Sequence, residues 1–293
     1  MELRQLECFV ACCEQGTFTA AARSLDLVQS AVSTSVAKLE RELGTRLFDR
    51  TPTALHLTPA GEAAVGPARL ALAARQRVRD AVASTSGELT GTVVVGALVN
   101  VHGFDLARAF AEVHRAHPGV SIAMRQHPRG TAGNIAGLLD GSLDLALGAF
   151  TTVPPSIMVE PLAAEPLVLV TSAQHRLAGG WFRLADLAAE RIVDFPPGWG
   201  TRAIVDEAIP MRDSVIEVAD QGFAIQLAVS GFGVTLVPRS VAESVPGTPT
   251  ARCLDHPLPW RMGVAWQTAL TPSLAARAVL DALIALRRIE IRA

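Results

Sequence analysis

The sequence of 293 residues contains no tyrosine, and aromatic residues make up only 5% of it. Lysine is almost absent too, since Lys38 is its single occurrence among 26 basic residues. The 26 basic and 28 acidic residues give a net charge of −2, so overall charge indicates neither a nucleic acid nor an anionic membrane as partner. Only the placement of particular residues can therefore indicate such a partner.

Long apolar runs are missing as well. The longest are too short, or too interrupted by polar residues, to span a bilayer. The first residues do not combine a charged start, an apolar core and a small-residue cleavage site, as a secretion signal does. We therefore expect a cytoplasmic protein without a membrane partner.

Motifs of the common enzyme classes are also absent. The sequence has no nucleophile elbow, P-loop, HExxH motif or GxGxxG after a predicted strand. Three of the four cysteines, Cys8, Cys12 and Cys13, lie in the first predicted helix, but no histidine nearby in sequence completes a set of metal ligands. Small buried side chains are favoured there over a metal or redox site. The sequence predicts neither an enzyme nor a cofactor.

A predicted helix beginning at Gln29 has two contrasting faces. One face carries apolar residues at helical spacing, which predict contact with the core: Val32, Val36, Leu39 and Leu43. The opposite face is short and polar for two turns and then basic: Ser30, Ser33, Thr34, Lys38 and Arg41. Such a face can bond base edges in a groove while its basic end meets phosphates, although an ordinary solvated face is the alternative.

The segments around this helix favour the nucleic-acid interpretation. Residues 17–28 predict a short helix that a tight turn joins to the polar-faced one, which is the helix-turn-helix arrangement. The runs RLFDR and ALHLT, which follow it, predict a hairpin wing. Thr58 is expected to cap the next helix, and Pro59 to begin it.

These segments resemble the amino-terminal domain of LysR-type transcriptional regulators, notably MELRQLECFVACCEQGTFTAAARSL, QSAVSTSVAKLERELGTRLFDR and LTPAGE. The resemblance continues through ELTGTVVVGA, LLDGSLDLALG and AVSGFGVTLVP, so it covers almost all of the chain. It implies base contacts from Gln29, Ser30, Ser33 and Thr34, and a wing contact to the DNA backbone from Arg50.

The chain departs from the family pattern at two positions of the polar-faced helix. Val28 stands where the family usually has serine, and Thr34 stands where arginine or glutamine is common. Residues 1–90 contain ten basic and ten acidic residues, so the non-specific attraction to DNA should be modest.

From residue 92 onward, predicted strands and helices alternate. TVVVG reads as a strand covered on both faces, and the spacing of the following elements predicts a mainly parallel sheet. A second such unit begins near residue 162, and the chain is expected to return to the first through MGVAWQ and a final helix from Ser273. Two lobes joined by crossing strands resemble the type-2 periplasmic-binding-protein fold.

We therefore predict an α+β multidomain protein. Residues 1–58 form a winged helix-turn-helix, and residues 59–89 form a linker helix and hinge that pairs two copies. Residues 90–293 form a two-lobe α/β effector domain. Lobe I spans about 90–161 and 267–293, and lobe II about 162–266.

Effector contacts are expected beyond the carboxyl ends of the strands, near helix N-termini that favour anions. Asn100 follows the first strand of this region, and Thr131 is expected to cap the next helix. Trp199 is a candidate lid over the cleft, and Arg202 could pair with a ligand carboxylate. An ordinary cap, loop or surface role is the alternative for each. The complete set of candidates is Asn100, Thr131, Trp199, Thr201, Arg202 and Phe223.

The favoured function is a homodimeric or homotetrameric transcriptional regulator. It binds double-stranded DNA at a pseudo-palindromic operator and responds to a small-molecule effector, with anions among the candidates. The rivals are a solute-binding component of a transporter and an enzyme of two-lobe α/β fold. Salt-sensitive binding to a defined promoter separates the three, because neither rival predicts it.

Overall fold

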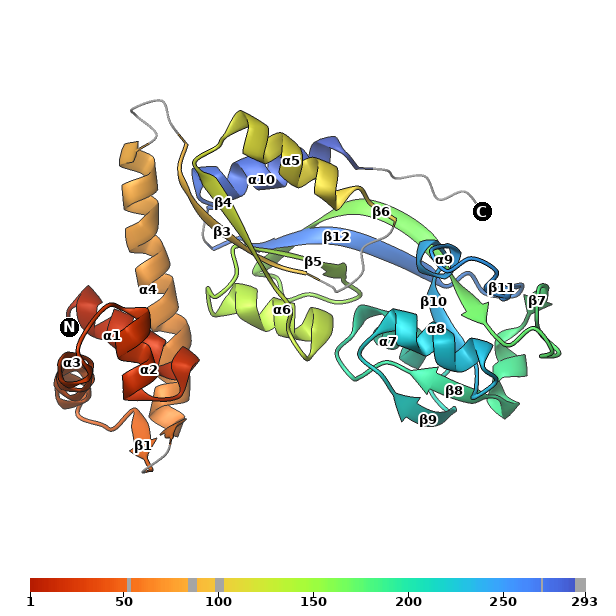
Figure 1. The fold of residues 1–293 in the computed structure, drawn as a ribbon, viewed down its shortest axis with the longest axis horizontal. Helices are drawn as coiled ribbons and strands as arrows, with labels where there is room; N and C mark the ends of the chain where they lie inside the picture. Colours follow the sequence, from red (N-terminus) through yellow and green to blue (C-terminus); the bar gives the residue numbers. More distant parts are fainter. Residues whose placement is uncertain (52–53, 84–88, 98–102, 270, 288–293) are drawn as a thin grey trace. The chain divides into compact units, whose positions relative to one another are not determined.

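The computed structural model describes residues 1–51, 54–83, 89–97, 103–269 and 271–287 (Figure 1). The chain divides into two compact units. The first is Met1–Gly87 with Leu139–Ser142, and the second is Glu88–Leu138 with Leu143–Ala293. No helix among the described residues is long and apolar enough to cross a membrane.

The first unit begins with three short helices, α1 (Leu3–Gln15), α2 (Phe18–Ser24) and α3 (Gln29–Leu43). Gly16 ends α1 in the left-handed conformation, with φ of 69°, which glycine adopts without strain. Thr17 then caps α2, because its side chain accepts a hydrogen bond from the backbone N–H of Ala20 at 3.1 Å. These two adjacent residues set the change of direction between α1 and α2.

The packing of α3 on α1 confirms most of the predicted apolar stripe. Val32, Val36 and Leu39 are buried in the core of this unit. Leu43 is 46% exposed, so its prediction as a core residue was wrong. It is the last residue of α3 and directly precedes Gly44, whose φ of 68° ends the helix, so Leu43 lies beyond the packed part of the helix.

The predicted wing is confirmed as an antiparallel hairpin of β1 (Phe48–Arg50) and β2 (Leu55–Leu57). Glu40 of α3 holds its start, because its carboxylate accepts hydrogen bonds from the backbone N–H groups of Leu47 at 2.9 Å and Phe48 at 3.3 Å. A long helix follows, α4 (Pro59–Ala83). The predicted cap of α4 is also confirmed, since the Thr58 hydroxyl accepts from the third residue of the helix.

The second unit contains two lobes, and the first lobe is built on parallel strands. The strands β3 (Gly91–Gly96), β4 (Val120–Arg125) and β5 (Leu145–Ala149) lie in the order β4-β3-β5. The helices α5 (Leu106–Ala116) and α6 (Gly130–Leu139) connect them. A further helix, α10 (Leu274–Ala285), packs on α5, and Figure 1 shows this pair on the opposite face of the sheet from α6.

Two long strands, β6 (Ile157–Val170) and β12 (Pro259–Gln267), run through both lobes. β12 pairs antiparallel with β5 and with the first part of β6, whose second part belongs to the other lobe. The sheet is therefore mixed, and the expectation of a mainly parallel sheet was wrong. The antiparallel pairs arise because each connection between the lobes is a direct strand, without the helical crossover that parallel pairing needs.

The second lobe also combines strands and helices. β8 (Arg191–Asp194) and β9 (Asp213–Glu217) are parallel, with α7 (Gly200–Ala208) between them in sequence and α8 (Gln221–Val229) after β9. β10 and β11 pair antiparallel with β6, and β7 pairs with β11. The remaining elements are β7 (Trp181–Phe182), the 3₁₀ helix Leu184–Ala189, β10 (Thr235–Pro238), α9 (Arg239–Glu243) and β11 (Thr250–Cys253).

We expect Glu40→Ala to loosen the connection between α3 and the wing. The substitution leaves two backbone N–H groups without their carboxylate, at a cost of roughly 1–3 kcal/mol. Hydrogen–deuterium exchange of Leu47 and Phe48 should become faster. Glu42→Ala is the matched control, because Glu42 lies on the same helix and its ion pair is with the amino terminus. Equal exchange in both variants would contradict the role of Glu40.

Candidate functional site

The outer face of α3 offers polar groups that have no partner in the described part of the chain. Ser33 is half-buried, whereas the other members of this face are exposed. No hydrogen bond or ion pair of these side chains occurs among the described residues, so their donors and acceptors are available to an external partner. The face consists of Gln29, Ser30, Ser33, Thr34, Lys38 and Arg41.

The N-terminus of α3 lacks the polar N-cap side chain that usually stabilises a helix. Val28 occupies the N-cap position, where it makes no side-chain hydrogen bond, and its side chain is 68% exposed. Asp26, in the preceding turn, has a φ of 53°, a left-handed conformation that aspartate tolerates better than most residues. From the sequence, Val28 is known only as a departure from the family pattern. The structure shows that it leaves α3 without a side-chain cap and that its own side chain faces solvent.

The wing places Arg50 at the end of β1, in register with Leu55 of β2. His56, the neighbouring residue on β2, is exposed and lies opposite Asp49. The predicted contact of Arg50 with the DNA backbone stays a prediction.

In the second unit, Thr131 lies near the contact between the lobes, but it is not the predicted helix cap. α6 begins at Gly130, so Thr131 is the second residue of the helix, and its side chain lies against Gly148 of β5. It is 4% exposed, and its hydroxyl oxygen has no hydrogen-bond partner among the described residues. Burying a hydroxyl without a hydrogen-bond partner costs free energy, so the position of Thr131 calls for an explanation.

Trp199 connects the two lobes and is neither a surface aromatic nor an open lid. It is 7% exposed and stacks on Phe195, with ring centroids 5.8 Å apart. Its indole N–H donates to the carbonyl of Pro128 in lobe I at 3.3 Å. The adjacent carbonyl of Gly198 accepts a hydrogen bond from the backbone N–H of Ala132 in α6 at 2.9 Å. We call Gly198–Gly200 and these lobe I contacts the inter-lobe joint.

The joint also needs close backbone contact at Gly200. A Cβ atom at this position would lie 2.3 Å from the carbonyl oxygen of Ala149 at the end of β5. Thr201, the next residue, is 3% exposed. Thr131, Trp199 and Thr201 are thus all buried, and none of them is open to solvent in this arrangement.

Arg202 is engaged within lobe II. Its guanidinium donates to Asp206 at 2.7 Å, to Glu217 at 2.9 Å and to the carbonyl of Phe195 at 2.8 Å. Burial alone would raise the pKa of Asp206, but hydrogen bonds from Arg212 and Arg202 lower it overall. The structure therefore gives Arg202 a role in fixing α7 to its lobe, and not as a partner for a ligand carboxylate.

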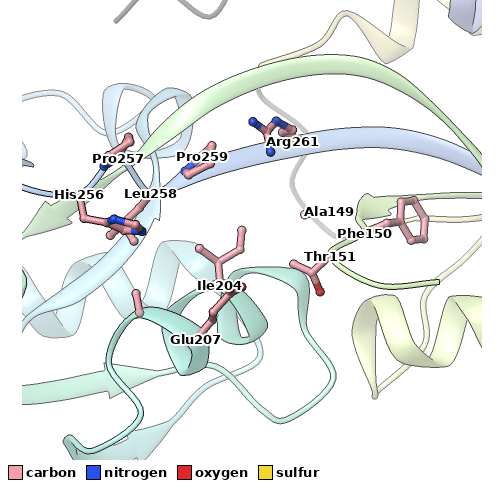
Figure 2. A pocket seen from close by; sticks show the side chains of 11 residues that line it. Ala149, Phe150, Thr151, Ile204, Glu207, His256, Pro257, Leu258, Pro259 and Arg261 are labelled. Carbon is pink, nitrogen blue, oxygen red and sulfur yellow. The ribbon is translucent and has the colours of Figure 1, made fainter.

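An open cavity of about 480 Å³ lies beside the joint, and its lining comes from distant parts of the chain (Figure 2). Figure 2 shows Arg261 of β12 on one side of the opening, with Ile204 and Glu207 of α7 on the other. His256 and Arg261 are exposed, and neither they nor Glu207 forms an ion pair among the described residues. The lining is Ala149, Phe150, Thr151, Ile204, Glu207, Ala208, His256–Pro259 and Arg261.

The predicted effector contacts that the structure describes do not line this cavity. Phe223 is 48% exposed near the start of α8, a helix that the Asp220 side chain caps. Asn100 lies outside the described residues. No sequence pattern indicated Arg261, His256 and Glu207, because Glu207 lies far from the other two in sequence and none of the three belongs to a motif.

The cysteines provide no support for redox or metal chemistry. Cys8 and Cys12 are buried in the core of the first unit. Burial raises the pKa of the Cys13 thiol to about 12, and burial also raises the pKa of Cys253, so the reactive thiolate form is disfavoured. Among the described residues, no group of three or more cysteine, histidine or acidic side chains could hold a metal ion.

Two protein-family descriptions match the chain. The family described as bacterial regulatory helix-turn-helix protein, lysR family, matches residues 3–62. The family described as LysR substrate binding domain matches residues 86–287. Together they match part of the first unit and most of the second, and residues 63–85 lie between the two matches.

Several similar proteins match this chain over almost their whole length. The HTH-type transcriptional regulator ShiR of Corynebacterium glutamicum (strain R) is 31% identical over 289 residues, which cover 96% of this chain and 97% of that protein. A full-length OxyR variant from Pseudomonas aeruginosa has a TM-score of 0.77 at 23% identity, covering 99% of this chain and 98% of that one. Full-length CbnR complexed with its target DNA has a TM-score of 0.63 at 25% identity, covering 97% and 99%.

We expect Gly200→Ala to destabilise the second unit, although alanine is the better helix former. The added methyl group meets the Ala149 carbonyl, and such overpacking costs roughly 1–3 kcal/mol. All four tryptophans lie in this unit, so thermal unfolding followed by their fluorescence reports on it. Gly180→Ala is the control, because its new Cβ has no atom within 4 Å. A higher unfolding midpoint for Gly200→Ala would contradict the tight joint.

Proposed function

This chain belongs to the LysR family of bacterial helix-turn-helix transcriptional regulators, and we propose that α3 reads its DNA target in the major groove. As a family member it is a DNA-binding transcriptional regulator with a substrate-binding domain, and not an enzyme. The observation that carries the proposal is the outer face of α3, whose polar side chains have no partner among the described residues. A helix-turn-helix places the second helix in the groove with its first residues at the base edges.

In this proposal the residues of α3 divide into two roles. Gln29, Ser30, Ser33 and Thr34 contact bases, because their short amide and hydroxyl groups suit donors and acceptors in the major groove. Lys38 and Arg41, further along the helix, contact phosphates together with Arg50 of the wing. The half-buried position of Ser33 limits its reach, so Gln29, Ser30 and Thr34 carry most of the base contacts.

We propose that the protein acts as a homodimer or homotetramer on a pseudo-palindromic operator. Two valines on α4, Val78 and Val82, are each 66% exposed and lie four residues apart on one side of the helix. A long helix with such residues is stabilised by packing against a second copy. Two-fold symmetry of the protein then requires two related half-sites in the DNA.

The effector is proposed to be a small molecule with an anionic group, bound between the two lobes of the second unit. The cavity volume suits a small metabolite, and no ion pair among the described residues occupies the donors of Arg261 and His256. Phe150, Ile204 and Leu258 supply apolar walls, and Glu207 can accept a hydrogen bond from a donor on the ligand. Thr131 does not line this cavity, so we retain it only as a group that an effector would meet after the lobes move apart, because its buried hydroxyl lacks a partner among the described residues.

A ligand here can alter the spacing of the lobes through the inter-lobe joint. The cavity and the joint share Ala149, and α7 contributes to both. An effector that prefers one separation of β5 and α7 shifts the population of lobe arrangements by its difference in affinity for them. Trp199 and Thr201 are proposed to transmit this change and not to bind the effector directly.

A DNase footprint on the DNA that flanks the gene tests the DNA-binding part of the proposal. Protection of a pseudo-palindrome by the full-length protein is the expected result, and the neighbouring genes would nominate effectors. Absence of sequence-dependent protection there and in a genome-wide pull-down would overturn the proposal.

We expect Lys38→Ala and Arg41→Ala to weaken binding to operator and random DNA by similar factors. Each variant should lower the slope of log K against log salt by about 0.9, the value for one lost phosphate contact on B-DNA. Fluorescence anisotropy at several salt concentrations measures this slope. Arg252→Ala is the control, because it removes one exposed positive charge in the second unit. An unchanged slope in the α3 variants would contradict their phosphate contacts.

We also expect Arg261→Gln to weaken the binding of small carboxylates about tenfold or more, since a hydrogen bond to a charged group contributes about 1.5–3 kcal/mol. A panel of aliphatic and aromatic monocarboxylates can be screened by thermal shift and then titrated by tryptophan fluorescence. Arg252→Gln serves as the control for the loss of an exposed arginine. The proposal fails if uncharged amide analogues bind as well as the carboxylates do.

A further inference from the structure

The N-cap residue of the recognition helix presents an exposed apolar side chain at a position where five other helices of this protein have a hydrogen-bonding one. Five helices have an N-cap residue whose side chain accepts a backbone N–H bond. α7 and α9 have no such bond from their N-cap residues, Trp199 and Pro238. The five capping residues are Thr17, Thr58, Asp105, Asp220 and Ser273. At the same position of α3, Val28 makes no such bond and is 68% exposed. α3 therefore lacks the stabilisation that a polar cap provides.

Packing does not explain Val28. The apolar residues of the same turn that secure it to the core are Leu25 and Leu27, both of which pack against the buried cluster of the first unit. The backbone N–H of Leu27 also donates to the carbonyl of Ala22 at 2.9 Å. Val28 is not among the residues of that cluster, so its side chain serves neither the core nor the helix end.

The position of Val28, next to the first residues of α3, indicates a role in contact with DNA. It directly precedes Gln29 and Ser30, which are exposed and have no partner among the described residues. The first residues of a recognition helix are the ones that approach base edges. The major groove displays one apolar group at those edges, the C5-methyl group of thymine, and apolar side chains recognise it by contact.

We propose that Val28 reads a thymine methyl group in each half-site of the operator. This inference rests on the proposed function, because it requires α3 to enter the major groove. It makes Val28 a determinant of DNA specificity, in addition to the polar residues of α3. A serine here would gain a helix cap and lose the methyl contact, so this position exchanges helix stability for sequence recognition.

The test replaces individual thymines by deoxyuridine, which pairs identically and lacks only the methyl group. Selection from random double-stranded DNA with the full-length protein first defines the preferred site. For the wild-type protein, substitution of the contacted thymine in one half-site should weaken binding about fourfold, the value for one methyl group lost from an apolar contact. For Val28→Ser and Val28→Ala, the same substitution should have almost no effect.

Val28→Ser also controls for folding. Its new hydroxyl should slow hydrogen exchange of the first amides of α3, which shows that the helix is intact and better capped. An equal deoxyuridine penalty in wild-type and Val28→Ser proteins, or no sensitive thymine, would overturn the role of Val28 alone. If the selection yields no preferred sequence, the proposed function fails together with this inference.

Discussion

The packing of α3 on α1 through Val32, Val36 and Leu39 determines what the first unit can present to a partner. Because a helix is rigid, burying one stripe fixes the direction of every other side chain on it. The remaining face carries the hydroxyl, amide and basic groups, which have no partner among the described residues. Glu40, on the same helix, holds the start of the wing, so the reading face and the wing are positioned by one element.

The two lobes of the second unit are connected in two ways, by a pair of long strands and by a few individual contacts. β6 and β12 run side by side between the lobes and are paired along the whole length of β12. The inter-lobe joint, in contrast, consists of two individual hydrogen bonds and a close backbone contact. A change in lobe spacing therefore costs least at Gly198–Gly200, which lies beside the cavity.

The arginines of the second unit differ in whether a carboxylate of the protein pairs with them, and this difference separates structural arginines from candidate ligand-binding ones. Arg202 and Arg212 are surrounded by carboxylates of their own lobe, and they stabilise the contact of α7 with its neighbouring strands. Arg261 has no carboxylate partner among the described residues and lines a cavity. All three residues are arginines, so residue type does not distinguish them. The difference is whether the fold places a carboxylate next to the guanidinium.

Features that depend on neighbouring residues could be predicted without a structure. The helix-turn-helix, the buried face of α3 and the cap of α4 at Thr58 follow from periodicity and capping, which act within a few residues. Long-range packing was needed to establish that Leu43 lies beyond the core, that Thr131 lies inside α6, and that Arg202 is engaged. The cavity also depends on that packing, because Phe150, Glu207 and Arg261 come from segments far apart in sequence. Their proximity follows from how two strands cross between the lobes, and no local pattern records that.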